Sequence, residues 1–244
     1  MAAVTISMPE TAMIMAAGKG TRMMPLTKDR PKPLVGVAGQ TLLDHVLDHL
    51  RKAGVGRIVV NVHYLADQIE AHLARHAGDF AVSISDERHL LLDTGGGLVQ
   101  ARDMIEGDPF ICVNADNWWV DGAQNALARL AEAWDGGVMD VLMLVVPTTR
   151  AGNTQGTGDF DLDETGRLSR EGEKRDRPYV WTGIQMMAKR LIIDPPEKVF
   201  STNVFWSRAI AEGRCYGLVH DGMWFDVGYP EAIGLTEMAI GFGD

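Results

Sequence analysis

Short apolar runs alternate with segments of helical periodicity over the first 147 residues of this 244-residue chain. The apolar runs predict strands, at residues 12–17, 57–62, 81–85, 109–114 and 139–146. Between them, apolar side chains recur at helical spacing from Leu42 to Leu50 and again at Leu65, Ile69 and Leu73. Gly54 and Gly78 follow where such helices end. This alternation predicts a Rossmann-like α/β fold, an open and mostly parallel sheet flanked by helices.

The pattern changes after Pro147. Residues 151–168 are rich in Gly, Thr and Asp, and the apolar runs TGIQMM and WFDVG follow before a closing helix from about Pro230. We predict a flexible tail over residues 1–10 and a single domain over 11–244. Its first lobe would span 11–147, and a small β-rich lobe with the closing helix would span 148–244. In an open α/β sheet, ligands bind beyond the carboxyl ends of the strands.

Composition excludes several classes of function. With 33 acidic and 23 basic residues the net charge is −10, which argues against nucleic-acid binding. The apolar runs are too short to span a membrane. The two cysteines, Cys112 and Cys215, have no partners at metal-ligand or disulfide-framework spacing. The first ten residues contain no Lys or Arg ahead of the weak apolar stretch, unlike a secretory signal, so a cytoplasmic protein is expected.

The strongest motif follows the first predicted strand, in the run Ala16-Ala17-Gly18-Lys19-Gly20-Thr21-Arg22. Gly18 and Gly20 can adopt positive φ and leave room for backbone N–H groups to surround an anion. Arg22 supplies a guanidinium fork for phosphate oxygens, and Lys32, between Pro31 and Pro33, supplies a point charge. Neither of the two common phosphate-binding glycine fingerprints is present. The run therefore predicts a phosphate loop of another kind.

Two aspartates are candidate metal ligands. Asp116 follows the apolar run 110–114, which places it at the carboxyl end of a strand beside the phosphate loop. Asp226 lies in the mostly apolar run MWFDVG, where an unpaired carboxylate is costly unless an ion or hydrogen bonds compensate it. Mg²⁺ binds one or two carboxylates together with phosphate oxygens and water, so a converging pair fits a metal–nucleotide site.

These motifs resemble the sugar-1-phosphate nucleotidyltransferases, whose signature is Ala-Ala-Gly-x-Gly-Thr-Arg followed by Pro-Leu-Thr and Pro-Lys-Pro. Within that family the chain is most similar to the N-acetylmuramate-1-phosphate uridylyltransferases of bacterial cell-wall recycling. It is short and carries, in order, residues 93–97 (DTGGG), 114–116 (NAD), 158–160 (GDF) and 224–228 (WFDVG). The resemblance covers about residues 11 to 240. It implies a GT-A-like nucleotidyltransferase fold whose first lobe binds nucleotide and whose second binds sugar.

The resemblance also implies a reaction and its residues. A uridylyl group would pass from UTP to N-acetylmuramate 1-phosphate, giving UDP-N-acetylmuramate and pyrophosphate. The implied catalytic residues are Arg22, Lys32 and Asp116, and Mg²⁺ would be bound by Asp116 and Asp226. The implied nucleotide-binding residues are Ala16, Ala17, Gly18, Gly20, Thr21, Arg22, Lys32, Thr94, Gly95 and Gly96, the last three at the uracil. The candidate sugar-binding residues are Asn114, Asp159, Thr182 and Gly183.

The implied reaction does not need a side chain as a general base. The second pKa of a phosphate monoester is about 6, so the sugar phosphate is already mostly dianionic at neutral pH and needs no general base. The protein must hold two anionic reactants in line and neutralise the charge that gathers on the leaving pyrophosphate. Arg22 and Lys32 are expected to act mainly by stabilising the transition state and the leaving pyrophosphate.

Several residues keep a second interpretation. Thr94 is also a candidate N-cap for a helix running to Arg102, and Asp93 stands where many relatives have Glu. Trp118, Trp119 and Trp181 are candidate platforms for a pyranose or packing residues. Lys174 resembles the sugar-phosphate lysine of larger thymidylyltransferases.

Two other functions remain open. One is the same chemistry with glucose, mannose or N-acetylglucosamine 1-phosphate and UTP, dTTP or GTP; many such relatives have a further C-terminal domain, whereas this chain ends soon after Asp226. The other is a non-catalytic nucleotide-sugar sensor, against which the presence of Arg22, Lys32, Asp116 and Asp226 together argues. The expected partners are UTP and a sugar 1-phosphate, with no nucleic acid and no membrane, and the expected state is a monomer or small homo-oligomer.

Overall fold

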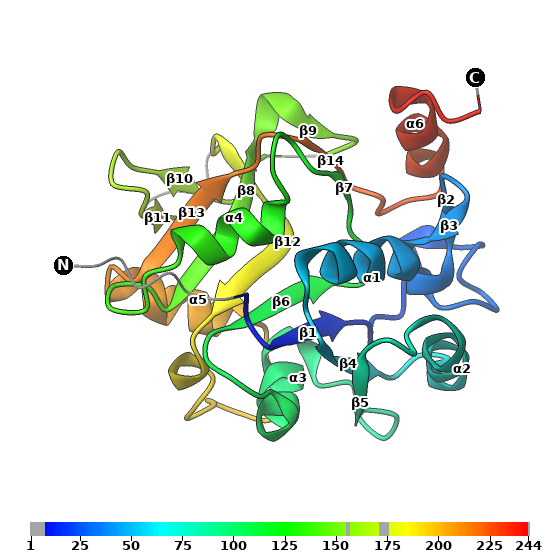
Figure 1. The fold of residues 1–244 in the computed structure, drawn as a ribbon, viewed down its shortest axis with the longest axis horizontal. Helices are drawn as coiled ribbons and strands as arrows, with labels where there is room; N and C mark the ends of the chain where they lie inside the picture. The colour runs from blue at the N-terminus through cyan, green and yellow to red at the C-terminus, as the bar shows by residue number, and fades with distance from the viewer. Residues whose placement is uncertain (1–7, 155–156, 171–175, 244) are drawn as a thin grey trace.

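The computed structural model describes residues 8–154, 157–170 and 176–243 (Figure 1). A central seven-stranded sheet has the order β13-β8-β12-β6-β1-β4-β5. Its strands, in chain order, are β1 (Thr11–Met15), β4 (Arg57–Val62), β5 (Ala81–Asp86), β6 (Phe110–Asn114), β8 (Val141–Pro147), β12 (Tyr179–Met187) and β13 (Cys215–Val219). All are parallel except β12, which pairs antiparallel with both β6 and β8. The predicted mostly parallel sheet is confirmed.

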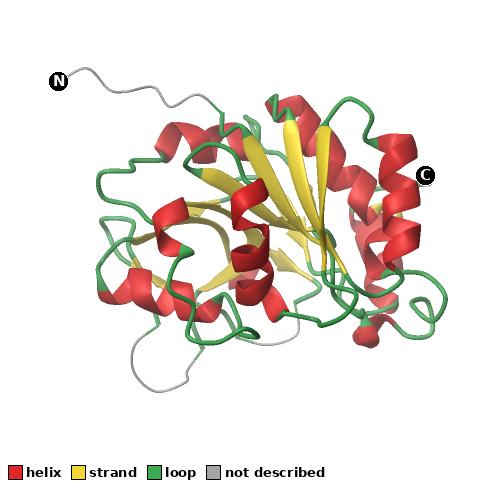
Figure 2. Ribbon diagram, turned by 90° about the horizontal axis from the view of Figure 1, so that it is seen from below, coloured by secondary structure: helices red, strands yellow, loops and turns green. Residues whose placement is uncertain are grey.

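Helices cover both faces of this sheet, which gives three layers (Figure 2). The α-helices are α1 (Leu42–Ala53), α2 (Ala66–His76), α3 (Asp93–Ala101), α4 (Ala126–Ala133), α5 (Asn203–Ala211) and α6 (Glu231–Ala239). Apolar side chains of α1, α2 and α4 pack on one face and those of α3 and α5 on the other. Because strand side chains alternate between faces, Ala12 and Ile14 of β1 join the first core and Met13 the second.

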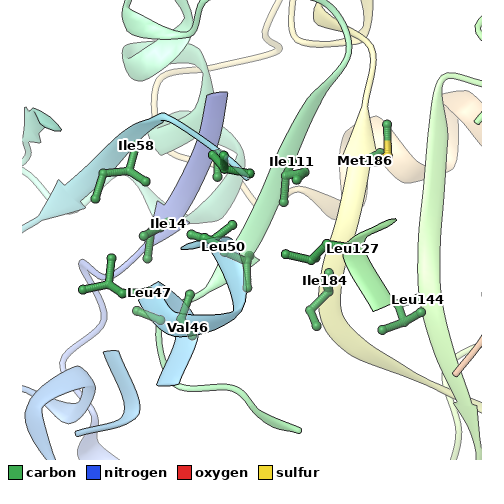
Figure 3. Close-up of a cluster of buried hydrophobic side chains, with 14 of the residues drawn as sticks. Ile14, Val46, Leu47, Leu50, Ile58, Ile111, Leu127, Leu144, Ile184 and Met186 are labelled. Atoms are coloured by element: carbon green, nitrogen blue, oxygen red, sulfur yellow. The ribbon is translucent and has the colours of Figure 1, made fainter. Parts of the chain in front are cut away.

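The first core is a continuous aliphatic layer between α1, α4 and the sheet (Figure 3). Val46, Leu47 and Leu50 of α1 are 0–1% exposed and meet Ile14 and Ile58 of the strands. The Thr41 hydroxyl caps α1 by accepting from the N–H of Asp44, and Gly54 ends it in the left-handed conformation, as its sequence position predicted. The helix is therefore fixed by its own caps and its apolar stripe.

The second half of the chain contributes to the same sheet. β12 inserts between β6 and β8, and β13 forms the edge beside β8. Three smaller sheets accompany it. They are the pair β2 (Gly36–Val37) with β3 (Gln40–Thr41), the pair β10 (Asp161–Leu162) with β11 (Leu168–Ser169), and the set β7 (Trp118–Val120), β14 (Met223–Phe225) and β9 (Ala151–Gly152). The division into lobes at residue 147 stays a prediction.

Short 3-10 helices occupy the turns around the sheet. They span Thr21–Met23, Lys32–Leu34, Arg102–Met104, Thr148–Arg150 and Lys189–Leu191. The closing helix α6 begins directly after Pro230, as predicted. Within the described residues no helix is both long and apolar enough to cross a membrane.

Both cysteines are free and buried on the sheet. Burial raises the pKa of the Cys112 thiol and that of the Cys215 thiol to about 12. Neither thiol is therefore a nucleophile at neutral pH.

Candidate active site

Three neighbouring strands bring the predicted motifs together at the carboxyl edge of the sheet. Met15, the last residue of β1, is paired in register with Asn61 of β4 on one side and Asn114 of β6 on the other. The segments that follow β1 and β6 therefore start side by side, although nearly a hundred residues separate them in sequence. β1 ends at Met15 rather than at Ala17, so Ala16 and Ala17 already belong to the loop.

The phosphate loop turns at Gly20, whose φ is +63°. A Cβ at Gly20 would lie 3.0 Å from the Cβ of Lys32, so glycine is needed for both conformation and close packing. The Thr27 hydroxyl donates to the Gly20 carbonyl at 2.8 Å and holds the turn. Gly18 does not have positive φ, contrary to our expectation, and the space beside it is open. Gly18 therefore leaves open space at the wall of a cavity, and its backbone does not need glycine for a turn.

A buried hydrogen-bond chain supports this loop. The N–H of Ala16 donates to Asn61 Oδ1 at 2.7 Å, and Asn61 Nδ2 donates to Glu87 Oε1 at 2.7 Å. Glu87 Oε2 accepts from the N–H of Leu92 at 3.0 Å. Burial of the Glu87 carboxyl raises its pKa, while the hydrogen bonds from Leu92 and Asn61 oppose that shift. The chain ties the phosphate loop to the start of α3.

Asn61 and Glu87 are not among the site residues predicted from the sequence. Asn61 is 2% exposed and stands inside the apolar run RIVVNV, and a polar residue there could have marked it as a hydrogen-bonding group.

Arg22, Lys32, Asp116 and Asp226 line one cavity of about 210 Å³, although four separate segments supply them. Lys32 Nζ donates to Asp116 Oδ2 at 2.7 Å. A Cβ at Gly228 would lie 2.7 Å from Asp226 Oδ1 and 3.0 Å from Arg22 Nη1, so that carboxylate and that guanidinium converge on the same glycine. Two cations and two carboxylates thus face one space.

The donors in this cavity suit a hard divalent cation. Asp116 and Asp226 offer carboxylate oxygens, both half-buried and both open to the cavity, and would hold such a cation together with phosphate oxygens of a ligand. Asp44, His72 and His76 form another group of candidate ligands, with ligand atoms within 4.8 Å of one another, but they lie between α1 and α2 and share no residue with this cavity.

The same cavity has polar groups without protein partners. Asn117 is 6% exposed, and among the described residues its Nδ2 has no hydrogen-bond acceptor. The Thr154 hydroxyl is likewise buried without a partner in that part of the chain. Both residues line the cavity of the two aspartates. Since buried donors are rarely left unpaired, this arrangement favours a polar ligand.

The structure of residues 93–97 differs from the predicted helix cap and exposed turn. Thr94 is not a helix N-cap, because α3 already begins at Asp93 after Leu92. The expected exposed turn is instead the first turn of this helix, and the N–H groups of Gly95 and Gly96 both donate to the Phe200 carbonyl, at 2.8 and 3.1 Å. The Thr94 hydroxyl accepts from the N–H of Thr202 at 2.9 Å. A uracil contact would therefore have to use groups that these bonds leave open.

Thr94 still lines a cavity of about 430 Å³ together with Ala17, Gly18, Asn114 and Asp116. That cavity joins the phosphate loop to the start of α3, and three of the predicted nucleotide residues, Ala17, Gly18 and Thr94, line it. Gly95 and Gly96 are buried instead. A Cβ at Gly95 would lie 2.5 Å from the Phe200 ring, and one at Gly96 would lie 2.4 Å from the Lys198 carbonyl. These two glycines permit close packing of α3 on the segment before α5.

The four predicted sugar residues lie in two adjoining cavities. Asn114, Thr182 and Gly183 line the cavity of the two aspartates, and Asn114 and Asp159 line a neighbouring cavity of about 490 Å³. The Thr182 hydroxyl is already committed to the Leu144 carbonyl, at 2.8 Å. Gly183 has φ +81°, and a Cβ there would lie 2.5 Å from Asn117 Oδ1.

Asp159 Oδ2 accepts from the N–H of Trp181 at 2.9 Å. The carboxyl is solvent-accessible, but the cavity walls remove part of its hydration, which raises its pKa.

Of the tryptophans, only Trp181 lines both cavities. Trp118 packs edge-on against Phe225, and Trp119 stacks on His49 with ring centroids 3.8 Å apart. Both are core residues, 3–4% exposed. Lys174 lies outside the described residues.

The family model described as nucleotidyl transferase matches residues 11–240. The chain belongs to the nucleotidyl transferase family. This confirms the resemblance to sugar-1-phosphate nucleotidyltransferases drawn from the motifs.

Two proteins similar to this chain have the same name. The N-acetylmuramate alpha-1-phosphate uridylyltransferase of Caulobacter vibrioides is 42% identical over 92% of this chain and 94% of its own length. That of Neisseria meningitidis is 44% identical over 43% of this chain and 46% of its own. The solved inositol-1-phosphate CTP transferase from T. maritima superimposes with a TM-score of 0.77 at 18% identity, over 96% of both chains, which shows the shared fold.

Proposed function

We propose that this protein transfers a uridylyl group from UTP to N-acetylmuramate 1-phosphate and releases pyrophosphate. The observation that carries the chemistry is the convergence of Arg22, Lys32, Asp116 and Asp226 on one cavity. The substrates are inferred from the relative that is 42% identical over 92% of the chain.

In this proposal the nucleotide phosphates occupy the cavity lined by Gly18, Gly20, Thr21, Arg22 and Lys32. Arg22 binds phosphate oxygens through its guanidinium fork, and Lys32 neutralises charge on the leaving pyrophosphate. The base enters the cavity lined by Ala17 and Thr94, beside the phosphate loop.

The sugar 1-phosphate lies on the other side, near Asn114, Asn117 and Gly183. There Asn117 Nδ2 and the Thr154 hydroxyl have no hydrogen-bond partner among the described residues.

A divalent cation, Mg²⁺ in this proposal, would be held by Asp116 and Asp226. When bound it supplies charge neutralisation and a template for the phosphates. The protein's own groups position the reactants. A phosphate monoester is mostly dianionic at neutral pH, so the sugar phosphate attacks without a protein base. We place this activity in the cytoplasm, in the recycling of peptidoglycan sugars.

The test is pyrophosphate release with Mg²⁺, measured across four nucleoside triphosphates and five sugar 1-phosphates that include N-acetylmuramate 1-phosphate. Selective turnover of UTP with N-acetylmuramate 1-phosphate is the expected result. Preference for another pair would keep the chemistry and reject these substrates. Nucleotide binding without turnover of any pair would favour the sensor.

The role of Arg22 has its own test. Arg22→Ala is expected to lower kcat about 10²- to 10³-fold, as loss of a transition-state donor does. If only the KM for UTP changed, Arg22 would bind ground state and transition state equally, and its proposed role would be wrong.

A further inference from the structure

The cavity that contains Asp159 also presents a cation that the transfer chemistry does not use. Arg170, which follows β11, lines this cavity. Its guanidinium reaches α5, where Nη1 donates to Asn203 Oδ1 at 2.6 Å and Nη2 donates to the Asn203 carbonyl at 2.9 Å and the Ser207 hydroxyl at 2.6 Å. All three acceptors are neutral.

Arg170 is a half-buried cation whose charge is not neutralised by direct contact with any described carboxylate. Across the described residues no carboxylate lies within salt-bridge distance of its guanidinium. Its pKa is lowered, chiefly because partial burial removes hydration. The Arg177 guanidinium lowers the pKa further by repulsion, while the electrostatic effects of Cys215 and Asp159 oppose the shift. Arg177 differs, since its Nε donates to Asp161 at 3.3 Å. An anion in this cavity would relieve both costs of Arg170.

Aromatic rings form the wall beside this cation. Trp206 meets Phe160 and Trp181 edge-on, with ring centroids 6.0 and 4.6 Å apart, and all three residues line the cavity. The Arg170 Cζ lies 5.9 Å from the centre of the Phe160 ring. An apolar wall next to a cation is complementary to a substituent that combines a methyl group with a carboxylate.

We propose that Arg170 binds the lactyl carboxylate of the sugar substrate and so selects an acidic sugar 1-phosphate over neutral ones. The inference rests on the proposed function, because the two cavities must hold one sugar 1-phosphate. They share Asn114 and Trp181, so a pyranose at the reaction cavity can extend its substituent toward Arg170. Glucose, mannose and N-acetylglucosamine 1-phosphates carry no carboxylate for Arg170 to bind.

Three substrates separate charge from shape. They are N-acetylmuramate 1-phosphate, its lactyl amide, which keeps the shape without the charge, and N-acetylglucosamine 1-phosphate. Arg170→Met is expected to lower kcat/KM for the acid about 10- to 100-fold, the range for losing a charge-assisted hydrogen bond, and to leave the two neutral substrates unchanged. Arg170→Lys, which keeps the charge, is expected to recover part of the loss.

Arg208→Met is the matched control. Arg208 belongs to α5, the helix that Arg170 contacts. Its guanidinium donates to the Ile193 and Asp194 carbonyls, and Arg208 does not line the cavity. Its substitution is expected to leave the preference for the acid intact. Melting temperatures of all variants show whether each one folds.

Equal losses on the acid and its amide would mean that Arg170 only anchors β11 to α5, and would overturn the proposal. No loss on the acid would overturn it as well. A wild type that uses the acid and its amide equally well would reject carboxylate recognition and leave uridylyl transfer standing.

A wild type that does not use N-acetylmuramate 1-phosphate with UTP would reject the proposed function instead. Equilibrium binding of that sugar phosphate to the wild type and to Arg170→Met then decides the role of Arg170 separately. Weaker binding by the variant supports the proposal, and equal binding, or none to either protein, overturns it.

Discussion

Lys32 Nζ donates to Asp116 Oδ2 at 2.7 Å, and 84 positions separate the two residues in sequence. The Lys32 side chain is 10% exposed and that of Asp116 is 35% exposed, so the ammonium group is the more buried partner of the pair. The contact joins the Pro-Lys-Pro segment to the loop that follows β6. Under the proposed function, phosphate groups that enter the cavity would compete with Asp116 for the same ammonium group.

This pairing predicts non-additive kinetics. Lys32→Met and Asp116→Asn are each expected to lower kcat about 10²- to 10³-fold, because each removes charge from the reaction centre. The double variant is expected to lose much less than the product of the two effects, since the residues act as a unit. Pyrophosphate release measures all three. Lys28→Met, an exposed lysine of the same segment, is the control; fully additive losses would contradict a shared role.

Asp226 is expected to set the requirement for the divalent cation. Asp226→Asn removes one carboxylate from the cavity, so the Mg²⁺ concentration for half-maximal rate is expected to rise about tenfold or more. Asp221→Asn is the matched control, because Asp221 lies nearby in sequence but pairs with Arg129 at 2.6 Å on the surface. A Mg²⁺ titration of initial rates measures both. An unchanged requirement in Asp226→Asn would show that this carboxylate does not bind the cation.

Glu87 is expected to make stability depend on pH. Burial holds the pKa of Glu87 above its ordinary value of 4.5. The folded state therefore binds the proton more tightly than the unfolded state, and the contribution of this group to stability falls as pH rises from about 4.5 through the folded pKa.

Glu87→Gln removes that titration. Urea denaturation from pH 4 to pH 7 is expected to show a wild-type stability that declines relative to the variant as pH rises. The variant itself should be less stable by about 1–3 kcal/mol, because an amide nitrogen replaces one of two buried acceptors. A difference between the two proteins that is constant with pH would show that Glu87 does not titrate abnormally.

Gly183 is expected to be required for binding of the sugar 1-phosphate. Its φ is +81°, and a Cβ would lie 2.5 Å from Asn117 Oδ1 and 2.9 Å from Asn114 Nδ2. Gly183→Ala should displace both amides and raise the KM for the sugar 1-phosphate, with a stability loss of about 1–3 kcal/mol. Gly78→Ala is the control, because nothing lies within 4 Å of its Cβ position. Unchanged sugar kinetics in Gly183→Ala would show that the amides do not bind the sugar.

Local patterns were sufficient where a local cause sets the structure. The β4 bounds match the predicted strand, and Gly54 ends α1 as its position after the apolar stripe predicted. Local patterns were misleading at residues 93–97, where Thr94 and three glycines predicted a cap and an exposed turn. The helix α3 already begins at Asp93. The N–H groups of Gly95 and Gly96 in its first turn donate to the Phe200 carbonyl, more than a hundred residues away.

The sequence by itself determined the class of fold, the phosphate loop with Arg22 and Lys32, and the family, because these depend on periodicity and on residue types at short spacing. Only the tertiary structure decided which distant groups share a cavity. The sheet order brings together the segments that form the Lys32–Asp116 contact and the Ala16–Asn61–Glu87 chain. It also brings Arg170 and Asp159 to the wall of one cavity. Strand order and register have no signature in a single sequence, since they arise from packing both faces of the sheet at once.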